Sequence, residues 1–549
     1  MSSDELFRND EIEREQYTNA VIKSKSKKKV IVAGPGTGKT FLFGKILDGK
    51  PKSVTLTFIN ALVDDLSLKL FGVSEVKTLH GFARSPLGDH IEIYPKLPMV
   101  IKYDGQFLLG EEINFERLLN SREDENDYVK FYSERRKYYR KYFGFTDIIY
   151  GLTKCYDEHP DKIPSFQQVV IDEFQDFNKL EVDLVNHLAT KSPILIAGDD
   201  DQALYNFKDA SPDYIREKHG SGNPEYEAFD LPFCSRCPRI IVEAAADIID
   251  RATKKGLLKR RVNKKFQYFN SEKKNSISEK YPTIDFAVKH DKQIPWYIEN
   301  EIVKIAKDLR EEFSVLIISP LKSQSIRIGK CFQVKGLENV EYPRENIDDV
   351  CIMDGMNILT DDIHCNLGWR IISQFSLSEE NFTALLKKSY SDPSVQFENI
   401  IDKNFLKSVK KLVKIMKKIK SGKDVDDERL MKLLEFLKFD FTGLIKDTLR
   451  RKLLLLSDKD TKKCYPNIRK IPIRTATVQG SKGLAADYVF ITHLDDKYFL
   501  DDKTTIGDRD IYKLLVALTR AKSKAYLIST NKELPTLLSL VSSDKIKGL

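Results

Sequence analysis

Short apolar runs recur along the chain, and the stretches between them repeat their apolar residues at helical spacing. Uninterrupted apolar runs of this length are typical of parallel strands that are buried on both faces. Their alternation with helices predicts an α/β protein built on parallel sheets. The predicted strands are residues 30–33, 54–58, 169–171, 194–197, 315–319, 488–491 and 525–529.

Two long stretches interrupt this alternation. Residues 85–159 are rich in Tyr, Lys and Arg, and residues 346–465 are dominated by Lys and Leu at helical spacing. Both are expected to be mainly helical insertions into the α/β framework. A chain of 549 residues exceeds what a single hydrophobic core supports, so several domains are expected.

Composition narrows the class of protein. The chain is 41% hydrophobic and 31% charged, has no apolar run near the length of a membrane span, and lacks a basic leader followed by an apolar segment. We therefore expect a soluble cytoplasmic protein with no membrane partner. The 90 basic and 82 acidic residues give a net charge of +8, which is compatible with a polyanionic partner without establishing one.

Cysteine usage indicates a reducing compartment. The chain has 7 cysteines, an odd number scattered over its length, which does not suggest a disulfide framework. Cys234 and Cys237 form a CxxC pair without a second pair at zinc-finger spacing. Metal binding, redox chemistry and chance spacing are the alternatives for this pair.

The segment VIVAGPGTGKT, residues 30–40, joins a predicted strand to a glycine-rich loop and a helix. In such a loop the main-chain N–H groups and the helix N-terminus face phosphates, a lysine neutralises the β and γ oxygens, and a hydroxyl reaches Mg²⁺. Ala33 stands where the strict pattern has Gly. The predicted phosphate-binding residues are Gly34, Gly36, Thr37, Gly38, Lys39 and Thr40, with Thr40 also at the metal.

Acidic residues follow the predicted strand of VVIDEFQD. Asp172 and Glu173 come at its carboxyl end, where the first carboxylate is expected to hold Mg²⁺ and the second to orient or deprotonate water. Adjacent acids are usually surface charge, but their place behind a buried strand and downstream of a phosphate loop favours the catalytic interpretation.

A further strand leads into ILIAGDDDQALYNFKDA, residues 194–210. Gln202 is expected to sense the γ-phosphate. Tyr205 and Phe207 offer flat faces on which unstacked bases can stack, and Lys208 lies beside them. This segment would therefore couple binding and hydrolysis of the nucleotide to binding of nucleic acid.

These motifs, in this order, resemble the UvrD/Rep-like family of superfamily 1 helicases. TATVQGSKGLAADYVFI at 475–491 resembles the family's motif V, and LLVALTRAKSKAYLI at 514–528 resembles motif VI, with Arg520 in the place of the arginine finger. LPFCSRCPRII at 231–241 is a looser match to motif IV and places Arg236 as a second γ-phosphate ligand.

The resemblance implies two RecA-like motor domains, each interrupted by an insertion. The implied domains are 1A at 1–84 and 160–230, 1B at 85–159, 2A at 231–345 and 466–549, and 2B at 346–465. It also implies that ATP and Mg²⁺ bind between the motors, that closure completes the site, and that hydrolysis reopens it.

Further site residues are implied by the same resemblance. Gln16 would read adenine, and Gly483 of motif V would lie at the nucleotide. Single-stranded DNA would cross both motors in the 3′ to 5′ direction. The remaining implied nucleic-acid contacts are Thr57, Phe58, Asn60, Thr78, His80 and Thr477.

The chain departs from the family pattern around the nucleotide base. Phe41 stands where the family commonly has Arg, Ser235 where it has Tyr, and Ala485 where an acid touches the ribose. We hypothesise weaker base and sugar discrimination, with Gln16 as the main adenine reader; the alternative is that neighbouring residues fill the same space. Phe207 replaces the usual Trp and remains able to stack.

Basic residues gather in the insertions. ERRKYYRKY at 134–142 suits either a phosphate-and-base surface or a solvated helix with its tyrosines packed inward. In the segment 405–423 a lysine face opposes an apolar face, which suggests duplex contact or simple solvation. The lysines of this face are Lys407, Lys410, Lys411, Lys414, Lys417 and Lys418.

Two functions remain open at this point. The first is an ATP-dependent 3′ to 5′ DNA helicase acting on single strands and on junctions with duplex, associated with a prokaryotic nucleoid. The second is a nucleic-acid-gated NTPase that signals to a protein partner, for example in antiviral defence, without processive unwinding. A binding module without hydrolysis is disfavoured because Lys39, Glu173 and Arg520 are all present.

Overall fold

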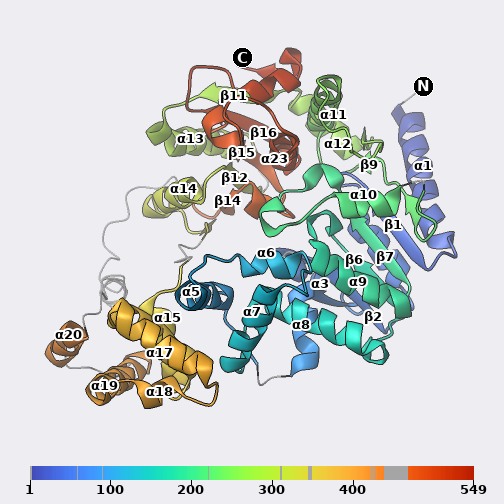
Figure 1. Ribbon diagram of the computed structural model, residues 1–549. Coiled ribbons are helices and arrows are strands. Elements are labelled where there is room, and N and C mark those ends of the chain that lie inside the picture. Colours follow the sequence, from blue (N-terminus) through green and yellow to red (C-terminus); the bar gives the residue numbers. More distant parts are fainter. Residues whose placement is uncertain are drawn as a thin grey trace. The chain divides into compact units, whose positions relative to one another are not determined.

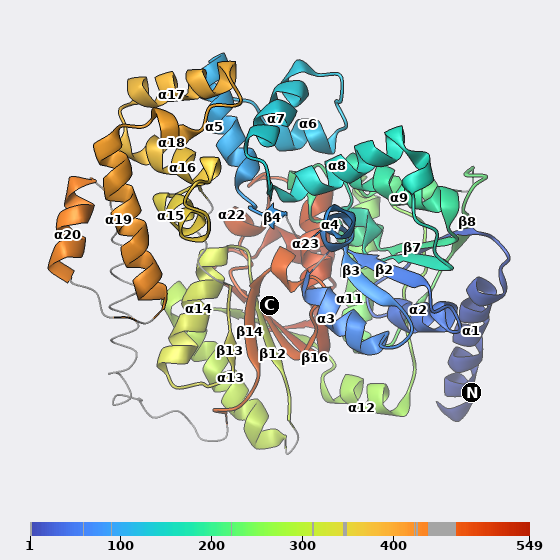
Figure 2. The same ribbon diagram turned by 90° about the horizontal axis from the view of Figure 1, so that it is seen from below.

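The computed structural model describes residues 3–58, 60–88, 91–220, 222–309, 312–343, 349–421, 423, 427–437 and 468–549 (Figures 1 and 2). Contacts divide the chain into two compact units. The first comprises Met1–Phe82, Thr153–Glu345 and Thr461–Leu549, and the second comprises Ala83–Leu152 and Asn346–Asp460. None of the described helices is long and apolar enough to cross a lipid bilayer.

The first parallel sheet of the first unit positions three of the predicted motifs. Its strand order is β3-β2-β6-β7-β1-β8, and helices α1 and α2 cover one face through an apolar core that includes Val21, Leu42 and Phe43. Because the strands are parallel, the loops that follow β1, β6 and β7 emerge at the same edge. The strands are β1 Lys28–Val32, β2 Ser53–Thr57, β3 Glu75–Thr78, β6 Gln168–Ile171, β7 Ile194–Gly198 and β8 Glu227–Phe229.

The second parallel sheet of this unit has the order β13-β14-β12-β15-β16-β11-β17. Alternate residues of β12 enter two different cores: Leu316 packs with α11 and α23, and Ile317 packs with α13 and α14. Both faces are therefore buried, as the uninterrupted apolar strands predict. The strands are β11 Ile284–Val288, β12 Val315–Ser319, β13 Val340–Glu341, β14 Ile473–Thr477, β15 Ala486–Ile491, β16 Ala521–Ser529 and β17 Ile546–Lys547.

A short two-stranded sheet, β9 Phe233–Cys234 with β10 Gln267–Tyr268, lies in the segment between the two large sheets. The helices of the first unit surround these sheets. They are α1 Ser3–Lys23, α2 Lys39–Leu47, α3 Asn60–Lys69, α9 Lys179–Lys191, α10 Asp213–His219, α11 Arg239–Lys254, α12 Glu272–Lys280, α13 Ile294–Asp308, α14 Lys322–Val334, α22 Asp496–Phe499 and α23 Asp508–Leu518. Two more, α4 Leu79–Arg84 and α8 Phe145–Glu158, run across the boundaries of the units.

The second unit is mainly helical, with a small parallel pair formed by β4 Glu92–Ile93 and β5 Tyr142–Phe143. One apolar core joins its two chain segments. Asp104 is fully buried in that core between Arg135 and Arg370, and it accepts hydrogen bonds from both guanidinium groups at 2.8 Å. The helices are α5 Leu97–Leu109, α6 Phe115–Asn120, α7 Asp127–Tyr138, α15 Ile352–Asp361, α16 Asn366–Ser376, α17 Glu379–Ser391, α18 Phe397–Ile400, α19 Lys403–Lys420 and α20 Asp427–Phe436.

The sequence predictions of fold class and of helical insertions are confirmed, and every predicted strand is present with its ends shifted by a few residues. Strands β3 and β14 were missed because Lys77 and Arg474 interrupt their apolar pattern; β3 is an edge strand, and β14 is covered on one side only by the short edge strand β13. The exact limits of the four implied domains stay a prediction.

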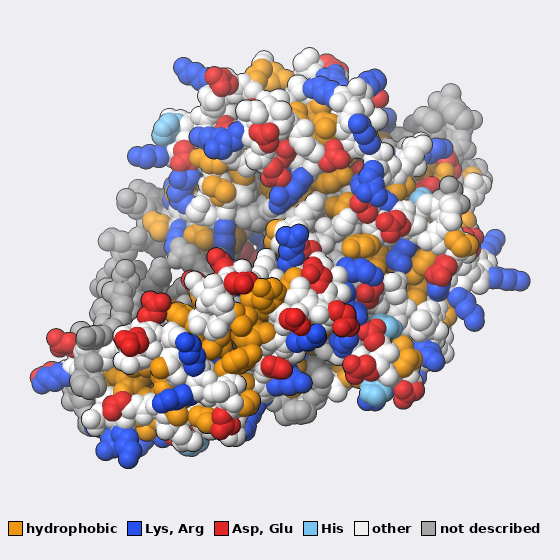
Figure 3. Space-filling view, viewed as in Figure 1, with side chains coloured by type: hydrophobic (Ala, Val, Ile, Leu, Met, Phe, Trp, Pro, Cys, Tyr) orange, Lys and Arg blue, Asp and Glu red, His pale blue; other side chains and the backbone are white. Residues whose placement is uncertain are grey.

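On the face shown in Figure 3, basic and acidic side chains are interspersed, so the excess positive charge forms no continuous patch among the described residues of that face.

Candidate nucleotide-hydrolysis site and nucleic-acid interface

The phosphate loop follows β1, and the main-chain N–H of Ala33 holds it to the first sheet by donating to Gly198 at 2.9 Å. Gly36 and Gly38 have φ angles of 70° and 92°, a left-handed conformation that glycine adopts without strain. Helix α2 then starts at Lys39 with no side-chain cap and no acidic residue in its first turn. Its N-terminal N–H groups and its dipole are therefore available to an anion.

Side chains of the loop bind the loop itself. The ammonium of Lys39 donates to the main-chain oxygens of Ala33 at 3.0 Å and Gly34 at 3.2 Å. The hydroxyl of Thr37 donates to the oxygen of Gly34 at 2.9 Å. Thr40 lies half-buried one residue beyond Lys39 on α2. The charge and donors of this loop suit a phosphate chain, and the Thr40 hydroxyl suits a hard cation beside it.

Asp172 and Glu173 lie at the carboxyl end of β6, as predicted, and Glu173 has an unusual φ of 56°. The amide of Gln175 donates to the Glu173 carboxylate at 2.6 Å, and its oxygen accepts the main-chain N–H of Asp199 at 2.9 Å. One glutamine thus connects the loop after β6 to the loop after β7. A strained residue held by such contacts is typical of catalytic positions.

The two carboxyl groups differ in acidity. Burial and the adjacent Glu173 charge raise the pKa of Asp172 to about 7. Burial also acts to raise the pKa of Glu173, but the nearby cations Lys482 and Lys39 outweigh it and hold that pKa below its usual value. Glu173 is therefore the carboxylate that stays ionised, which suits a residue that orients water.

Arg520 reaches the first sheet from the second. It precedes β16, it is buried, and it donates to the side-chain oxygen of Gln202 at 2.8 Å. The amide nitrogen of Gln202 in turn donates to Asp199 at 2.6 Å. The residues predicted as γ-phosphate sensor and arginine finger therefore lie in one hydrogen-bonded chain.

Arg236 packs directly on the phosphate loop. The main-chain N–H of Ser235 donates to the oxygen of Gly36 at 3.0 Å, and a Cβ placed on Gly36 would lie 2.4 Å from the Cβ of Arg236. The Arg236 guanidinium makes no hydrogen bond within the described part of the chain. Burial, followed by repulsion from Arg236, lowers the pKa of Arg520 to about 10. Two neighbouring cations with little compensation form a site for an anion.

Lys482 is a site residue that the motif reasoning missed, although the motif V segment contained it. It is buried, it forms an ion pair with Asp176, and it donates to the main-chain oxygen of Gln202 at 2.6 Å. Its ammonium also lies 3.5 Å from the Glu173 carboxylate. This lysine brings the loop after β14 against the loops after β6 and β7.

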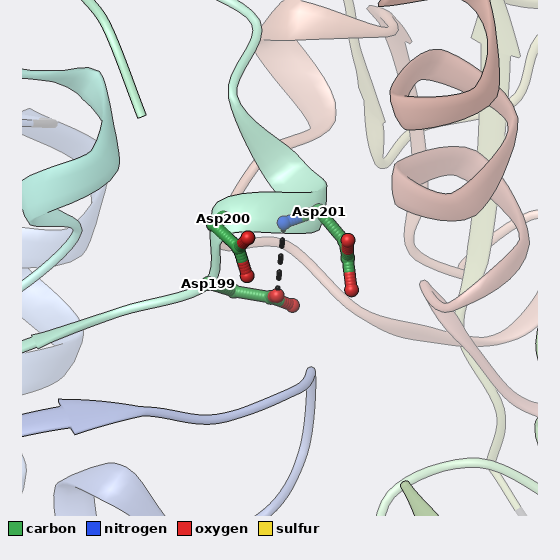
Figure 4. Close-up of side chains that lie close together, drawn as sticks. All are labelled: Asp199, Asp200 and Asp201. Atoms are coloured by element: carbon green, nitrogen blue, oxygen red, sulfur yellow. Dashed lines mark hydrogen bonds between the residues drawn. The ribbon is translucent and has the colours of Figure 1, made fainter. Parts of the chain in front are cut away.

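The carboxylates of Asp199, Asp200 and Asp201 converge at the turn after β7, in an arrangement that suggests a metal site (Figure 4). A buried ammonium occupies this position instead. Lys264 pairs with all three aspartates, at 3.0 Å to Asp199 and 2.7 Å to Asp201. The guanidinium of Arg261 adds a contact of 2.9 Å to Asp201. Sequence reasoning missed both cations because they lie in the unremarkable basic run KRRVNKK.

A small pocket beside the phosphate loop suits a nucleotide base. Phe41 faces it from α2 and is 58% exposed, and Phe233 faces it from β9. Gln16, the predicted adenine reader, is exposed on α1, whereas Arg14 lies over Gly38. The lining residues are Arg14, Tyr17, Thr18, Thr37, Gly38, Phe41, Leu231, Pro232 and Phe233.

Aromatic side chains gather where single-stranded nucleic acid was predicted. The rings of Phe58 and Tyr205 have centroids 5.1 Å apart, those of Tyr205 and Phe207 are 5.7 Å apart, and the Lys208 ammonium lies 4.9 Å from the Phe58 ring. Phe207 is 62% exposed. The Tyr205 hydroxyl donates to the main-chain oxygen of Gln479 at 3.3 Å, so this aromatic group contacts the motif V segment.

The other predicted nucleic-acid residues have different environments. Thr57 is fully buried at the end of β2, so the predicted contact is not accessible in this structure. The Thr78 hydroxyl accepts the main-chain N–H of Gly81 in α4, and the Thr477 hydroxyl accepts that of Gly480 in the turn after β14. His80 is half-buried, and burial followed by the Lys208 charge lowers its pKa to about 4. Asn60 begins α3 but its side chain lies outside the described part, and Gly483 has a φ of 80° in the loop before β15.

The basic segments of the second unit have distinct structures. In residues 134–142, Tyr138, Tyr139 and Arg135 are buried, so the tyrosines pack inward and offer no stacking surface to bases. On α19, Val409, Val413 and Met416 are buried on the apolar face, and the opposite face carries exposed lysines. Lys410 differs from its neighbours because it forms an ion pair with Glu398. The exposed lysines are Lys407, Lys411, Lys414, Lys417 and Lys418.

Comparison with known proteins agrees with this geometry. Residues 99–221 match the UvrD/REP helicase N-terminal domain, and residues 366–532 match the UvrD-like helicase C-terminal domain, together more than half of the chain. The chain is 23% identical over 429 residues to a probable DNA helicase II homolog of Mycoplasma genitalium, covering 71% of this chain and 58% of that protein.

Two further relatives carry helicase names. The ATP-dependent DNA helicase srs2 of Schizosaccharomyces pombe is 23% identical over 477 residues, covering 74% of this chain and 51% of that protein. The ATP-dependent DNA helicase Rep of Buchnera aphidicola is 26% identical over 184 residues, covering 31% of this chain and 28% of that protein. The chain spans little more than half the length of the first two of these relatives. With both domain models matched in their family order, the chain belongs to the UvrD/Rep-like family of superfamily 1 helicases.

Proposed function

We propose that this protein is an ATP-dependent DNA helicase that moves 3′ to 5′ along single-stranded DNA and separates duplex at junctions. The observation that carries the proposal is the chain of contacts from Arg520 through Gln202 to Asp199, which joins the loops of two parallel sheets at one phosphate loop. A site assembled from two sheets opens and closes with their separation, and this is what coupling of hydrolysis to movement requires.

The residues fit ATP with Mg²⁺. The uncapped start of α2, Lys39, Arg236 and Arg520 together provide donors and positive charge for a triphosphate. Thr40 and Asp172 would hold the metal ion, which would shield phosphate charge when bound. Glu173, held by Gln175, would orient the attacking water, and Arg520 would stabilise the charge that develops on the γ-phosphate.

The aromatic group formed by Phe58, Tyr205 and Phe207 supports coupling to a single strand. Tyr205 and Gln202 lie on the same loop after β7, so a change at the nucleotide is three residues away from a base-stacking side chain. Tyr205 also contacts Gln479, so separation of the two sheets would shift the stacking surface. Base–aromatic stacking tolerates any sequence, which suits a translocating enzyme.

The base pocket supports an unusual nucleotide preference. Phe41 offers an exposed aromatic face, and Arg14 contributes a cation, but none of the described residues that line the pocket presents a side-chain amide to the base. Stacking does not distinguish adenine from guanine. We therefore include weak base discrimination in the proposal; the alternative, that neighbouring residues fill the space of the family's Arg and Tyr, predicts a strict preference for ATP.

Two measurements on one preparation test the function. ATP hydrolysis is followed with and without single-stranded DNA, and strand displacement is followed on duplexes tailed at the 3′ or the 5′ end. The proposal expects stimulated hydrolysis and displacement from 3′ tails, and neither activity in K39A. Displacement from 5′ tails contradicts the polarity. Stimulated hydrolysis without any displacement identifies the nucleic-acid-gated NTPase instead.

A further inference from the structure

Lys264 is a buried ammonium to which the proposed function gives no role, although it lines a small cavity together with Gly34 of the phosphate loop. The segment that carries it is fixed on both sides. Before it, the main-chain N–H of Val262 donates to the Asp200 carboxylate at 2.8 Å. After it, the Phe266 ring packs on the phosphate loop, because a Cβ placed on Gly34 would lie 2.5 Å from that ring. The position of this ammonium is therefore set by the fold.

Three contacts lead from this ammonium to the guanidinium of Arg520. Lys264 forms an ion pair of 3.0 Å with Oδ1 of Asp199. The other carboxylate oxygen, Oδ2, accepts a side-chain N–H of Gln202 at 2.6 Å, and the side-chain oxygen of Gln202 accepts from Arg520 at 2.8 Å. All four side chains are buried, so bulk water does not compete for these contacts. The two donors at Asp199 occupy different oxygens and act at the same time.

The chemistry of the outer groups determines which way the Gln202 amide points. A carboxylate only accepts hydrogen bonds, and a guanidinium only donates them. The nitrogen of Gln202 must therefore face Asp199, and its oxygen must face Arg520. The reversed amide would bring two acceptors together at Asp199 and two donors together at Arg520. The contact that holds Arg520 thus depends on Asp199 remaining an acceptor.

Lys264 is the cation that keeps Asp199 in this form. Burial acts to raise the pKa of Asp199, but the Lys264 charge, followed by the Lys39 charge, outweighs it and lowers this pKa to about 2. A buried carboxylate that loses its ammonium partner is expected to take up a proton or to turn toward another cation. In either case Gln202 loses the partner that determines its orientation.

We propose that Lys264 is a positioning residue for nucleotide hydrolysis, which sets the orientation of the Gln202 amide through Asp199 and thereby the place of Arg520. The inference deepens the proposed function and rests on it, because Arg520 would act on the γ-phosphate. Lys264 itself does not touch the nucleotide in this proposal. Since Arg520 would stabilise charge that develops only in the transition state, the loss of its position should lower kcat and leave ATP binding nearly unchanged.

A mutant cycle on the full chain tests whether Lys264 acts through Gln202. Turnover and KM for ATP are measured with single-stranded DNA for K264M, D199N, Q202A and the double variants K264M/Q202A and D199N/Q202A. D199N keeps the shape of the side chain but has one amide oxygen, which Lys264 needs, so its nitrogen would face Gln202 and favour the reversed amide. It tests the same link where K264M fails to fold. K265M changes the adjacent exposed lysine and is the control.

The expected result is a fall of about tenfold to 10²-fold in kcat for K264M and for D199N, the cost of displacing a catalytic group by about 1 Å. KM should change little, and K265M should match the unchanged chain. Neither substitution should lower kcat further once Q202A is present, because residues that act in one chain are not additive. Equal falls with and without Gln202 would overturn the proposal, since the substitutions would then act by a route that bypasses the amide.

A measurement without turnover separates this inference from the proposed function. In a chain labelled isotopically at the glutamine side-chain nitrogens, the amide signal of Gln202 is assigned by its loss in Q202A. Its hydrogens should exchange slowly in the nucleotide-free chain, because this amide is buried and donates to Asp199. Exchange should be fast in K264M and D199N. Slow exchange in both variants would overturn the proposal even in an active enzyme, whereas fast exchange in a chain without turnover would support the link to Gln202 and remove the proposed function.

Discussion

Arg520 donates a 2.8 Å hydrogen bond to Gln202, although Gln202 follows β7 of the first parallel sheet and Arg520 precedes β16 of the second. The side-chain amide of Gln202 in turn donates to Asp199, and the Lys482 ammonium donates to the main-chain oxygen of Gln202. Gln202 is thus the residue through which the second sheet engages the loops of the first. Loss of the Lys482 ammonium or of the Arg520 guanidinium would therefore leave the nucleotide site on the first sheet without its contact from the second sheet.

Replacement of Arg520 by alanine should lower kcat for ATP by about 10³-fold, the lower part of the range for an arginine finger. ATP binding should change much less, because Lys39 and the start of α2 remain. Steady-state hydrolysis and equilibrium binding of a fluorescent ATP analogue separate the two effects. K522A, an exposed cation two residues away, is the control. Intact turnover in R520A would remove the basis of the motor proposal.

Removal of the Phe207 ring should weaken single-strand binding. An exposed stacking face contributes about 1–3 kcal/mol per base, so F207A should raise Kd by roughly 5- to 150-fold. Fluorescence anisotropy with oligonucleotides of mixed sequence measures the change. F71A removes another ring, 86% exposed, from the same unit, and it should have no effect. Equal losses in the two variants would mean that the aromatic group has no special role.

The ion pairs of Lys264 with three aspartates should hold the segment after α11 against the loop after β7. K264M removes the cation that pairs with all three buried carboxylates and leaves Asp199 without an ion-pair partner in the described part of the chain, which costs about 3–5 kcal/mol. Hydrogen exchange should therefore speed up at residues 199–202 and 258–269. K265M changes the adjacent exposed lysine and is the matched control. Unchanged exchange in K264M would show that the aspartates are stabilised in another way.

The base pocket predicts that kcat/KM values for ATP and GTP differ by less than about tenfold, because stacking on an aromatic ring is shared by both bases. R14A should raise KM for both nucleotides by about tenfold or less, the range of a single cation contact. Q16A should have a smaller effect, because Gln16 is exposed outside the pocket lining. A strict preference for ATP that disappears in Q16A would instead support Gln16 as the adenine reader.

The exposed lysines of α19 should contact duplex phosphates. Charge reversal of Lys407, Lys411, Lys414 and Lys418 should make the salt dependence of junction binding shallower, by about 0.9 in the slope for each phosphate that the lysines no longer neutralise. Binding to a tailed duplex is measured over a series of salt concentrations. The variant K387E/K388E on α17 carries exposed charge changes in the same unit as a comparison. An unchanged slope would leave the lysine face as ordinary solvated surface.

Much of the site could be read from local sequence because its parts lie next to strands. The phosphate loop, Asp172 and Gln202 each follow an apolar run, and parallel strands bring such loops to one edge. Lys264, Arg261 and Arg14 could not be found in this way. They come from helices and irregular segments without a recurrent pattern, and their partners lie far away in the sequence.

The sequence by itself determined the α/β class, the positions of the apolar strands β1, β2, β6, β7, β12, β15 and β16, and the identity of the phosphate loop and its acids, because apolar periodicity and short glycine-rich motifs are local properties. Only the tertiary structure decided that the ammonium of Lys264 occupies the aspartate cluster, that Tyr138 and Tyr139 pack inward, and that Cys234 and Cys237 border Gly36 and Thr519. The physical reason is that burial, pairing of charges and contact between distant segments depend on how the chain packs, and packing is set by all of its elements together.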